Sequence, residues 1–256
     1  MNFLDALILG VVEGLTEFLP VSSTGHLILA SSLLGLPDSE FLKSFEIAIQ
    51  SGAIAAVVAL YFRSFFDIEI IKRLIAAFIP TAVIGFALYS VVKTYFLGNE
   101  TLVLAALFLG GIALIVFELL YKEDGDAASS VTAITYKQAA FIGLFQALAM
   151  IPGVSRSGAT IVGGLLTSGI KRAAIVEFSF LLAVPTMLAA TGYDLLKSYS
   201  SFNTGDFGIL AVGLITSFFV AMAAIVFLLR FIRNHTFISF GIYRIAIALL
   251  FWLLIL

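Results

Sequence analysis

Long apolar runs fill most of this chain and alternate with short polar breaks. The runs cover residues 3–18, 24–36, 43–62, 72–96, 101–121, 136–150, 157–169, 173–197, 207–232 and 236–256. Several of them approach or exceed the roughly 20 residues that an α-helix needs to cross a bilayer. The pattern predicts an all-α, polytopic membrane protein that forms a single membrane domain over residues 1–256.

The two halves of the chain repeat each other. The stretch EGLTEFLPVSSTGH at 13–26 returns in altered form within QALAMIPGVSRSGAT at 146–160, at an offset of 133 residues. The offset aligns glycine, serine and apolar positions without a gap. We expect halves of about 1–122 and 135–256, joined by a polar loop at 122–135.

Each repeated motif lies between two apolar segments that are short for a full membrane crossing. The pairs are 3–18 with 24–36 and 136–150 with 157–169. Non-helical backbone at membrane depth is tolerated only where protein or a water-filled cavity satisfies it. We therefore predict two re-entrant helix-loop-helix hairpins and six transmembrane helices, three in each half. Because three is odd, the repeat must be inverted, and the two hairpins meet near the midplane from opposite faces.

The distribution of Lys and Arg predicts the orientation, because cytoplasmic loops carry an excess of both. The side that holds the N-terminus has three, Lys43, Lys93 and Lys197. The opposite side has nine, namely Arg63, Lys72, Arg73, Lys122, Lys137, Lys171, Arg172, Arg230 and Arg233. We expect the side with nine to be cytoplasmic, so that both termini lie outside and the first hairpin opens from the outside.

Composition narrows the classes of function. The chain is 61% hydrophobic and 12% charged, which is about half the charged fraction of a typical soluble domain. It has no cysteine, so disulfides, thiolate metal sites and thiol catalysis are excluded. It also has no basic stripe, so we expect no nucleic-acid partner; the partners are the lipid bilayer and a membrane-borne substrate.

The first motif carries two acids. Glu13 and Glu17 are four residues apart on a helix and share a face. Acids inside a membrane are costly and usually functional. We expect them to take part in acid–base chemistry or to bind a divalent cation, Mg²⁺ or Ca²⁺, since these ions prefer oxygen ligands. An interfacial, purely structural acid is the plainer alternative.

Hydroxyl groups and a histidine follow the acids. Ser22, Ser23 and Thr24 precede a helix, and we expect one of them to cap it. Ser23 is also the candidate nucleophile. His26 follows it by three residues, so both can face one cavity, where the imidazole would be the base for the serine. A structural His26 is the alternative.

The second motif carries a cation at the start of a helix. Free N–H groups and the helix dipole make a helix N-terminus a ready anion site, and the guanidinium fork of Arg156 matches phosphate oxygens. An ion pair with Glu13 or Glu17 is the plainer role for Arg156. The candidate phosphate-binding residues are Ser22, Thr24, Ser155, Arg156, Ser157, Gly158 and Thr160. Together with the acids, Ser23 and His26, they indicate phosphoryl chemistry on a lipid.

Other polar residues inside the apolar segments give weaker indications of function. Gln50 and Arg244 are expected to serve packing and hydrogen bonding, and Glu118, Glu177 and Asp194 to be interfacial.

The motifs at 13–26 and 152–160 closely resemble those of the undecaprenyl pyrophosphate phosphatase family, the bacitracin-resistance proteins. The resemblance runs over the full length. It implies a multi-pass enzyme of the bacterial cytoplasmic (inner) membrane whose active site opens to the periplasmic face. Such an enzyme removes the terminal phosphate of a polyprenyl diphosphate lipid, undecaprenyl pyrophosphate, and so recycles the carrier lipid of cell-wall peptidoglycan synthesis.

The resemblance also implies the functional positions and a divalent-cation requirement. The matching positions are Glu13, Glu17, Ser23, His26, Ser155, Arg156 and Thr160. A lipid flippase or small-anion transporter is the main alternative, because transporters often use inverted repeats. The unequal chemistry of the two motifs favours the enzyme. The sequence does not determine the prenyl chain length, the metal, or whether Ser23 or water attacks. It also leaves open whether the protein flips lipid and whether it forms a homodimer.

Overall fold

The computed structural model describes residues 1–37, 39–91, 100–198 and 207–255, and this part of the chain is helical without β-strands. One α-helix corresponds to each predicted apolar segment. The α-helices are α1 (Phe3–Thr16), α2 (Ser23–Leu33), α3 (Glu40–Leu60), α4 (Ile68–Val91), α5 (Glu100–Leu120), α6 (Tyr136–Ala147), α7 (Arg156–Leu165), α8 (Arg172–Ser198), α9 (Phe207–Phe231) and α10 (Ile238–Ile255). Short 3₁₀ helices are Phe62–Phe66, Val131–Ala133 and Leu148–Met150.

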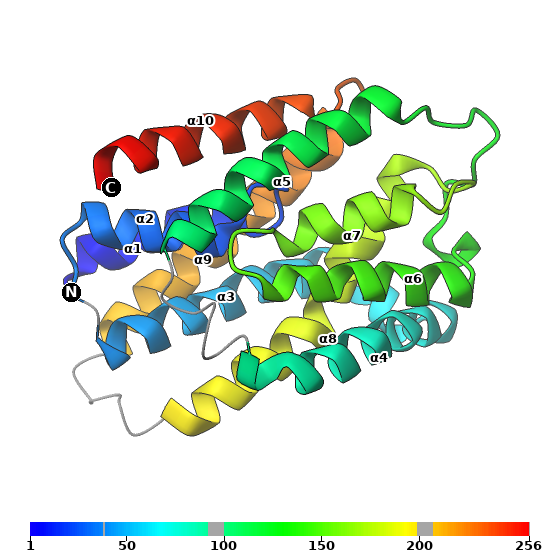
Figure 1. Cartoon of the computed structure of the whole chain (residues 1–256). Helices are drawn as coiled ribbons and strands as arrows, with labels where there is room; N and C mark the ends of the chain where they lie inside the picture. The colour runs from blue at the N-terminus through cyan, green and yellow to red at the C-terminus, as the bar shows by residue number, and fades with distance from the viewer. Residues whose placement is uncertain (38, 92–99, 199–206, 256) are drawn as a thin grey trace.

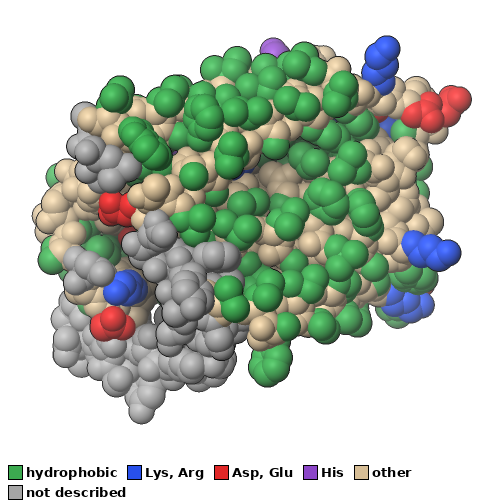
Figure 2. Space-filling view, viewed as in Figure 1, with side chains coloured by type: hydrophobic (Ala, Val, Ile, Leu, Met, Phe, Trp, Pro, Cys, Tyr) green, Lys and Arg blue, Asp and Glu red, His purple; other side chains and the backbone are tan. Residues whose placement is uncertain are grey.

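Within the described residues, five helices are long and apolar enough to cross a membrane. These spans are Glu40–Leu60, Ile68–Leu88, Glu100–Leu120, Arg172–Gly192 and Phe207–Phe231. A shorter apolar stretch, Ile238–Leu253, lies in α10. Figure 2 shows hydrophobic side chains over the middle of one face, with Lys, Arg, Asp and Glu near its ends. The predicted all-α chain with several membrane-crossing helices is thus confirmed, while the sixth crossing stays a prediction.

The long helices run along broadly similar directions (Figure 1). α1 begins and α10 ends at one end of the molecule, and the connection from α5 to α6 lies at the other end. α1 and α3 pack on α9, α4 packs on α6, and α5 packs on α10. Of the residues that predicted the orientation, Lys93 lies outside the described residues, and so does the side chain of Lys197. The side chain of Asp194, which was expected to be interfacial, also lies outside them.

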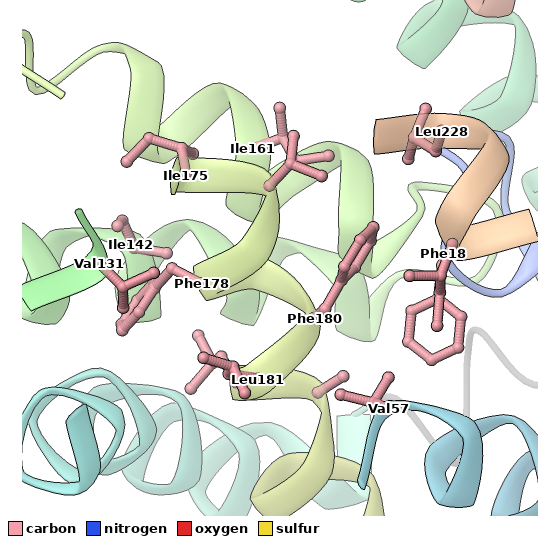
Figure 3. Close-up of a cluster of buried hydrophobic side chains, with 14 of the residues drawn as sticks. Phe18, Val57, Val131, Ile142, Ile161, Ile175, Phe178, Phe180, Leu181 and Leu228 are labelled. Carbon is pink, nitrogen blue, oxygen red and sulfur yellow. The ribbon is translucent and has the colours of Figure 1, made fainter. Parts of the chain in front are cut away.

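α8 supplies much of the main hydrophobic core. Its side chains Phe178, Phe180 and Leu181 are fully buried. Figure 3 shows them between Ile142 and Ile161 of the second half and residues from other helices. α8 contacts α3, α4 and α7. Since these neighbours surround its first turns, most of the side chains there are apolar. This packing places the N-terminal part of α8 beside the start of α7, where the second motif lies.

Glycines bring the motif-bearing helices close to their neighbours. A Cβ on Gly14 of α1 would lie 2.7 Å from the Cβ of Val220 in α9. A Cβ on Gly143 of α6 would lie 1.9 Å from the carbonyl oxygen of Ala77 in α4. Small residues permit such close approach between membrane helices. Each motif is therefore delivered by a helix that is held tightly against a longer one.

Glu118 and Arg172 form a buried ion pair between α5 and α8. Both η nitrogens of Arg172 donate to the Glu118 carboxylate, and the guanidinium lies over the rings of Tyr121 and Phe237 at 5.4 and 5.0 Å. Glu118 is only 6% exposed, so this acid is enclosed between α5 and α8, while its expected position at the membrane interface stays a prediction. The burial is tolerated because Arg172, distant in sequence, supplies both charge and hydrogen bonds.

Arg172→Met is expected to destabilise the protein by about 3–5 kcal/mol, because it leaves the Glu118 carboxylate buried without a partner. The double variant Glu118→Met with Arg172→Met removes both charges and should recover most of that loss. Thermal unfolding in detergent measures both variants. Equal melting temperatures for the single and the double variant would contradict the buried pairing.

Candidate active site

The segment between α1 and α2 contacts the first turn of α7 directly. The Ser157 hydroxyl donates to the Leu19 carbonyl oxygen at 2.8 Å. Arg156 Nη2 donates to Glu17 Oε1 at 2.7 Å. Two motifs that lie 133 residues apart in the sequence are thereby brought into one cluster.

The same unusual backbone conformation begins both short helices. Ser22 precedes α2 with φ 73°, and Ser155 precedes α7 with φ 75°. Positive φ is uncommon for residues other than glycine, and strained backbone of this kind gathers at functional sites. The two serines occupy equivalent positions of the repeat, so both loops keep one strained shape.

A pocket of about 160 Å³ lies between the two loops. Its walls are formed by Glu17, Ser22, Ser23, Thr24, Gln50, Ala149, Pro152, Gly153, Ser155, Arg156 and Met187. Six of these side chains are candidates from the sequence. Gln50, which was expected to serve packing and hydrogen bonding, also lies on the wall. Its only signal in the sequence is an amide inside an apolar helix.

Three other candidates lie behind the pocket wall. Ser157 and Thr160 have no exposed surface, and the Gly158 N–H donates to Ser155 Oγ at 3.1 Å. The Thr160 hydroxyl bonds to Ser179 and donates to the Arg156 carbonyl oxygen at 2.9 Å. In this arrangement these residues support the second loop, and contact between them and phosphate stays a prediction.

The two helix N-termini at the pocket are capped differently. The Ser155 side chain caps α7 by accepting from Gly158. At α2 the N-cap residue is Ser22, but its side chain makes no capping hydrogen bond, so the cap expected there is missing. The N–H groups in the first turn of α2 therefore lack a capping side chain beside the pocket, which favours anion binding at α2.

Glu17 connects the cation and the hydroxyl group of the cluster. Its Oε1 accepts from Arg156, and its Oε2 accepts from the Ser23 hydroxyl. Arg156 Nη1 also donates to the Ser179 carbonyl oxygen at 3.2 Å. Arg156 Nε is buried and has no hydrogen-bond partner among the described residues. A buried donor without an acceptor is costly, and a phosphate oxygen is an acceptor that would remove this cost.

His26 binds other partners than Ser23. Its Nδ1 lies 2.8 Å from the Ser22 carbonyl oxygen, and its Nε2 lies 2.8 Å from the Tyr243 hydroxyl. Because a carbonyl can only accept, Nδ1 carries the proton and Nε2 accepts from Tyr243. Neither ring nitrogen of His26 is bonded to the Ser23 hydroxyl in this structure, and the role of His26 as the base for Ser23 stays a prediction. Tyr243 of α10 occupies the Nε2 atom of His26. Glu17 lies close enough to Ser23 to accept the hydrogen bond from its hydroxyl group.

Glu13 is fully buried on α1. Neither of its carboxylate oxygens has a hydrogen-bond partner within the described ranges. An ionised carboxylate in such a place needs a cation or a proton. Glu13 and Glu17 together fit a hard divalent cation, which takes oxygen ligands. No group of three or more His, Cys, Asp or Glu suits a metal in the part of the chain that is described, so further ligands would be water or phosphate oxygens.

Fold and site together define an integral membrane protein with a pocket lined by charged and hydroxyl side chains inside a helical bundle. The chain belongs to the family of the bacitracin resistance protein BacA, whose model matches residues 6–250. This confirms the resemblance that the two motifs indicate.

Full-length relatives are known from several bacteria. The chain is 53% identical over 253 residues to an undecaprenyl-diphosphatase of Sulfurihydrogenibium sp. (strain YO3AOP1), with 99% of both chains covered. It is 52% identical over 248 residues to an undecaprenyl-diphosphatase of Aquifex aeolicus (strain VF5), with 96% of both chains covered. An undecaprenyl-diphosphatase of Wolinella succinogenes is 52% identical over 252 residues, which covers 98% of this chain and 97% of the relative.

Proposed function

We propose that this protein hydrolyses undecaprenyl diphosphate to undecaprenyl phosphate and inorganic phosphate, and so returns the carrier lipid to cell-wall synthesis. The observation that carries this function is the identity of about half the residues, over the full length, to relatives named undecaprenyl-diphosphatase. The pocket supports it, because Arg156, Glu17 and Ser23 meet there. A cation, an acid and a hydroxyl are the groups that phosphoryl transfer uses.

The geometry supports the following reaction. Arg156 and the first turn of α2 hold the terminal phosphate. The Ser23 hydroxyl attacks the terminal phosphorus and passes its proton to Glu17, with which it already shares a hydrogen bond. The bond from that phosphorus to the bridging oxygen breaks, and the lipid monophosphate leaves. Water then hydrolyses the phosphoserine and releases inorganic phosphate.

A one-step alternative uses the same residues. Water attacks the terminal phosphorus, Glu17 takes the water proton, and Ser23 only donates a hydrogen bond to phosphate. In both routes Glu17 takes the role that the sequence assigns to His26. His26 then orients the loop, because its Nδ1 donates to the Ser22 carbonyl oxygen.

Phosphate release from undecaprenyl diphosphate by the purified protein in detergent tests this function. Detergent removes the two compartments that transport requires, so a lipid flippase or anion transporter would release no phosphate. Arg156→Ala serves as the inactive control. Hydrolysis of the diphosphate by the parent protein and not by this control is the expected result. A parent protein without phosphate release would overturn the proposal.

Divalent-cation dependence is a further part of the proposal. Glu13 and Glu17 would hold Mg²⁺ or Ca²⁺, and the bound cation would supply positive charge next to the diphosphate. Glu13→Gln is expected to raise the cation concentration that gives half-maximal activity, because an amide is a weaker ligand than a carboxylate. Titration of chelator-treated protein with Mg²⁺ and Ca²⁺ measures this concentration. An unchanged cation dependence, with the parent's rate, would make Glu13 a structural residue.

We infer that the two hairpins are re-entrant and that the halves form an inverted repeat. Each helix of the first half has a counterpart in the second half, and exchanging every helix for its counterpart reproduces these four helix contacts. α1 packs on α9 as α6 packs on α4, while α3 with α8 and α5 with α10 are each a helix with its own counterpart. In Figure 1 the α1–α2 pair lies toward the end with the chain termini and the α6–α7 pair toward the opposite end.

We infer the orientation from the distribution of Lys and Arg, and we propose that the pocket opens to the periplasmic face of the cytoplasmic membrane. The chain has no cysteine, so single cysteines can be introduced without background. With an impermeant maleimide on intact cells, a cysteine at Asn2 is expected to react and one at Gly125 is not. Labelling of Gly125→Cys from outside would reverse the orientation.

A further inference from the structure

Arg244 lies behind both loops of the pocket, on a helix that carries neither motif. It is 2% exposed. Its five N–H donors meet five backbone carbonyl oxygens at 2.9–3.4 Å, those of Pro20, Ala106, Leu107, Gly153 and Val154. These carbonyls belong to the first loop, the second loop and α5. The expected hydrogen-bonding role of Arg244 is therefore confirmed. Its hydrogen bonds connect the two loops with each other and with α5.

Only arginine fits this position. A buried charge is tolerated only when its donors are satisfied, and no ion pair of Arg244 occurs among the residues that the structure describes. Arginine has five donors in a fixed planar fork, whereas lysine has three on a single nitrogen. The carbonyl groups of three separate segments can thus be held at fixed distances from one another by one arginine side chain.

The backbone around Arg244 leaves room for its guanidinium group. A Cβ on Gly110 of α5 would lie 2.1 Å from Arg244 Nη2. On the other side, a Cβ on Gly158 would lie 3.6 Å from Arg244 Nη1. The space for the guanidinium is thus bounded by α5 and by the first turn of α7.

The loop carbonyls that Arg244 binds lie close in sequence to the strained serines. Pro20 is two residues before Ser22, and Val154 directly precedes Ser155. The side chains that follow, Ser23 and Arg156, form the pocket wall. A shift of either loop would therefore move the nucleophile relative to the phosphate-binding cation.

We propose that Arg244 is a positioning residue for the reaction of this pocket, which holds the two loops in the register that lets Ser23 and Arg156 reach one phosphate group. The proposal rests on the proposed diphosphatase function. Arg244 does not line the pocket, so it acts through the loops and its loss should lower kcat more than it changes KM.

Arg244→Lys is the main test. The ammonium keeps the charge but cannot reach all five carbonyls, so the loops are expected to shift. A displacement of about 1 Å at an active site costs on the order of 10²-fold in rate, and we expect kcat to fall by that factor with little change in KM. Arg172→Lys is the matched control, because Arg172 is also buried but pairs with Glu118 outside the pocket. It should lower the melting temperature and keep the parent's kcat.

Gly110→Ala is the second variant and leaves Arg244 in place. Its Cβ collides with Arg244 Nη2 and should displace the guanidinium, which would lower kcat as Arg244→Lys does. The double variant should be no slower than the slower single variant, because both changes break the same contacts. Gly192→Ala is the control, since a Cβ at Gly192 has no neighbour within 4 Å.

A measurement without substrate separates this proposal from the proposed function. A cysteine introduced at Ser155, which is 7% exposed, should react slowly with a small maleimide. Arg244→Lys should speed the reaction, and Arg172→Lys should not. If the parent protein releases no phosphate but this pattern holds, the function fails and the positioning role stands. If Arg244→Lys keeps the parent's kcat and slow labelling, or if both lysine variants show equal losses, the positioning role is overturned.

Discussion

Arg156→Lys is expected to lower kcat by at least about 10³-fold, the range in which arginines act on transferred phosphoryl groups. The guanidinium now donates to Glu17 and to the Ser179 carbonyl, and its Nε has no partner among the described residues. A substrate phosphate can therefore gain a fork of N–H donors that lysine lacks. A lysine keeps the positive charge beside Glu17, so the fold should survive. Single-turnover release of phosphate measures the loss, and melting in detergent measures the fold.

Arg73→Lys is the control for this replacement. Arg73 is close to Glu69 and donates to the Ile134 carbonyl oxygen far from the pocket. The Arg73→Lys variant should keep the parent's kcat. Near-normal turnover by Arg156→Lys would remove the phosphate-binding role and leave Arg156 as a structural partner of Glu17.

Glu17→Gln is expected to lower kcat by about 10²–10⁴-fold, the usual contribution of a general base. The amide has nearly the shape of the carboxylate but cannot take the proton of Ser23 or of water. Part of the lost rate should return at high pH, where hydroxide is available. A pH profile of kcat for the Glu17→Gln and His26→Ala variants distinguishes the two candidate bases. Recovery at high pH for His26→Ala alone would restore the base role to His26.

Ser23→Ala separates the two routes. If Ser23 is the nucleophile, the loss should be at least as large as for Glu17→Gln, because no phosphoserine can form. If water attacks directly, measurable turnover should remain. A substrate with a chiral thiophosphate gives a second answer, since two displacements retain the configuration at phosphorus and one displacement inverts it.

Much of the site could be predicted because its parts are local. The acids, hydroxyls and arginine each belong to one of two short motifs, and the repeat itself places those motifs in equivalent loops. The closely similar positive φ values of Ser22 and Ser155 agree with this equivalence. Individual side-chain pairings could not be predicted in the same way. Spacing along α2 puts Ser23 and His26 on one face, but it does not show which neighbours compete for each hydroxyl or ring nitrogen.

The amino-acid sequence by itself determined the helices, their membrane character and the two motifs, because apolar length and helix breaks act over a few residues at a time. Tertiary structure decided which polar groups meet. Tyr243 reaches His26, Arg172 neutralises Glu118, Gln50 lies on the pocket wall, and Arg244 connects both loops. Each of these contacts joins segments that are far apart in the chain. A buried polar group must find a partner wherever packing provides one, and that location is a property of the assembled bundle.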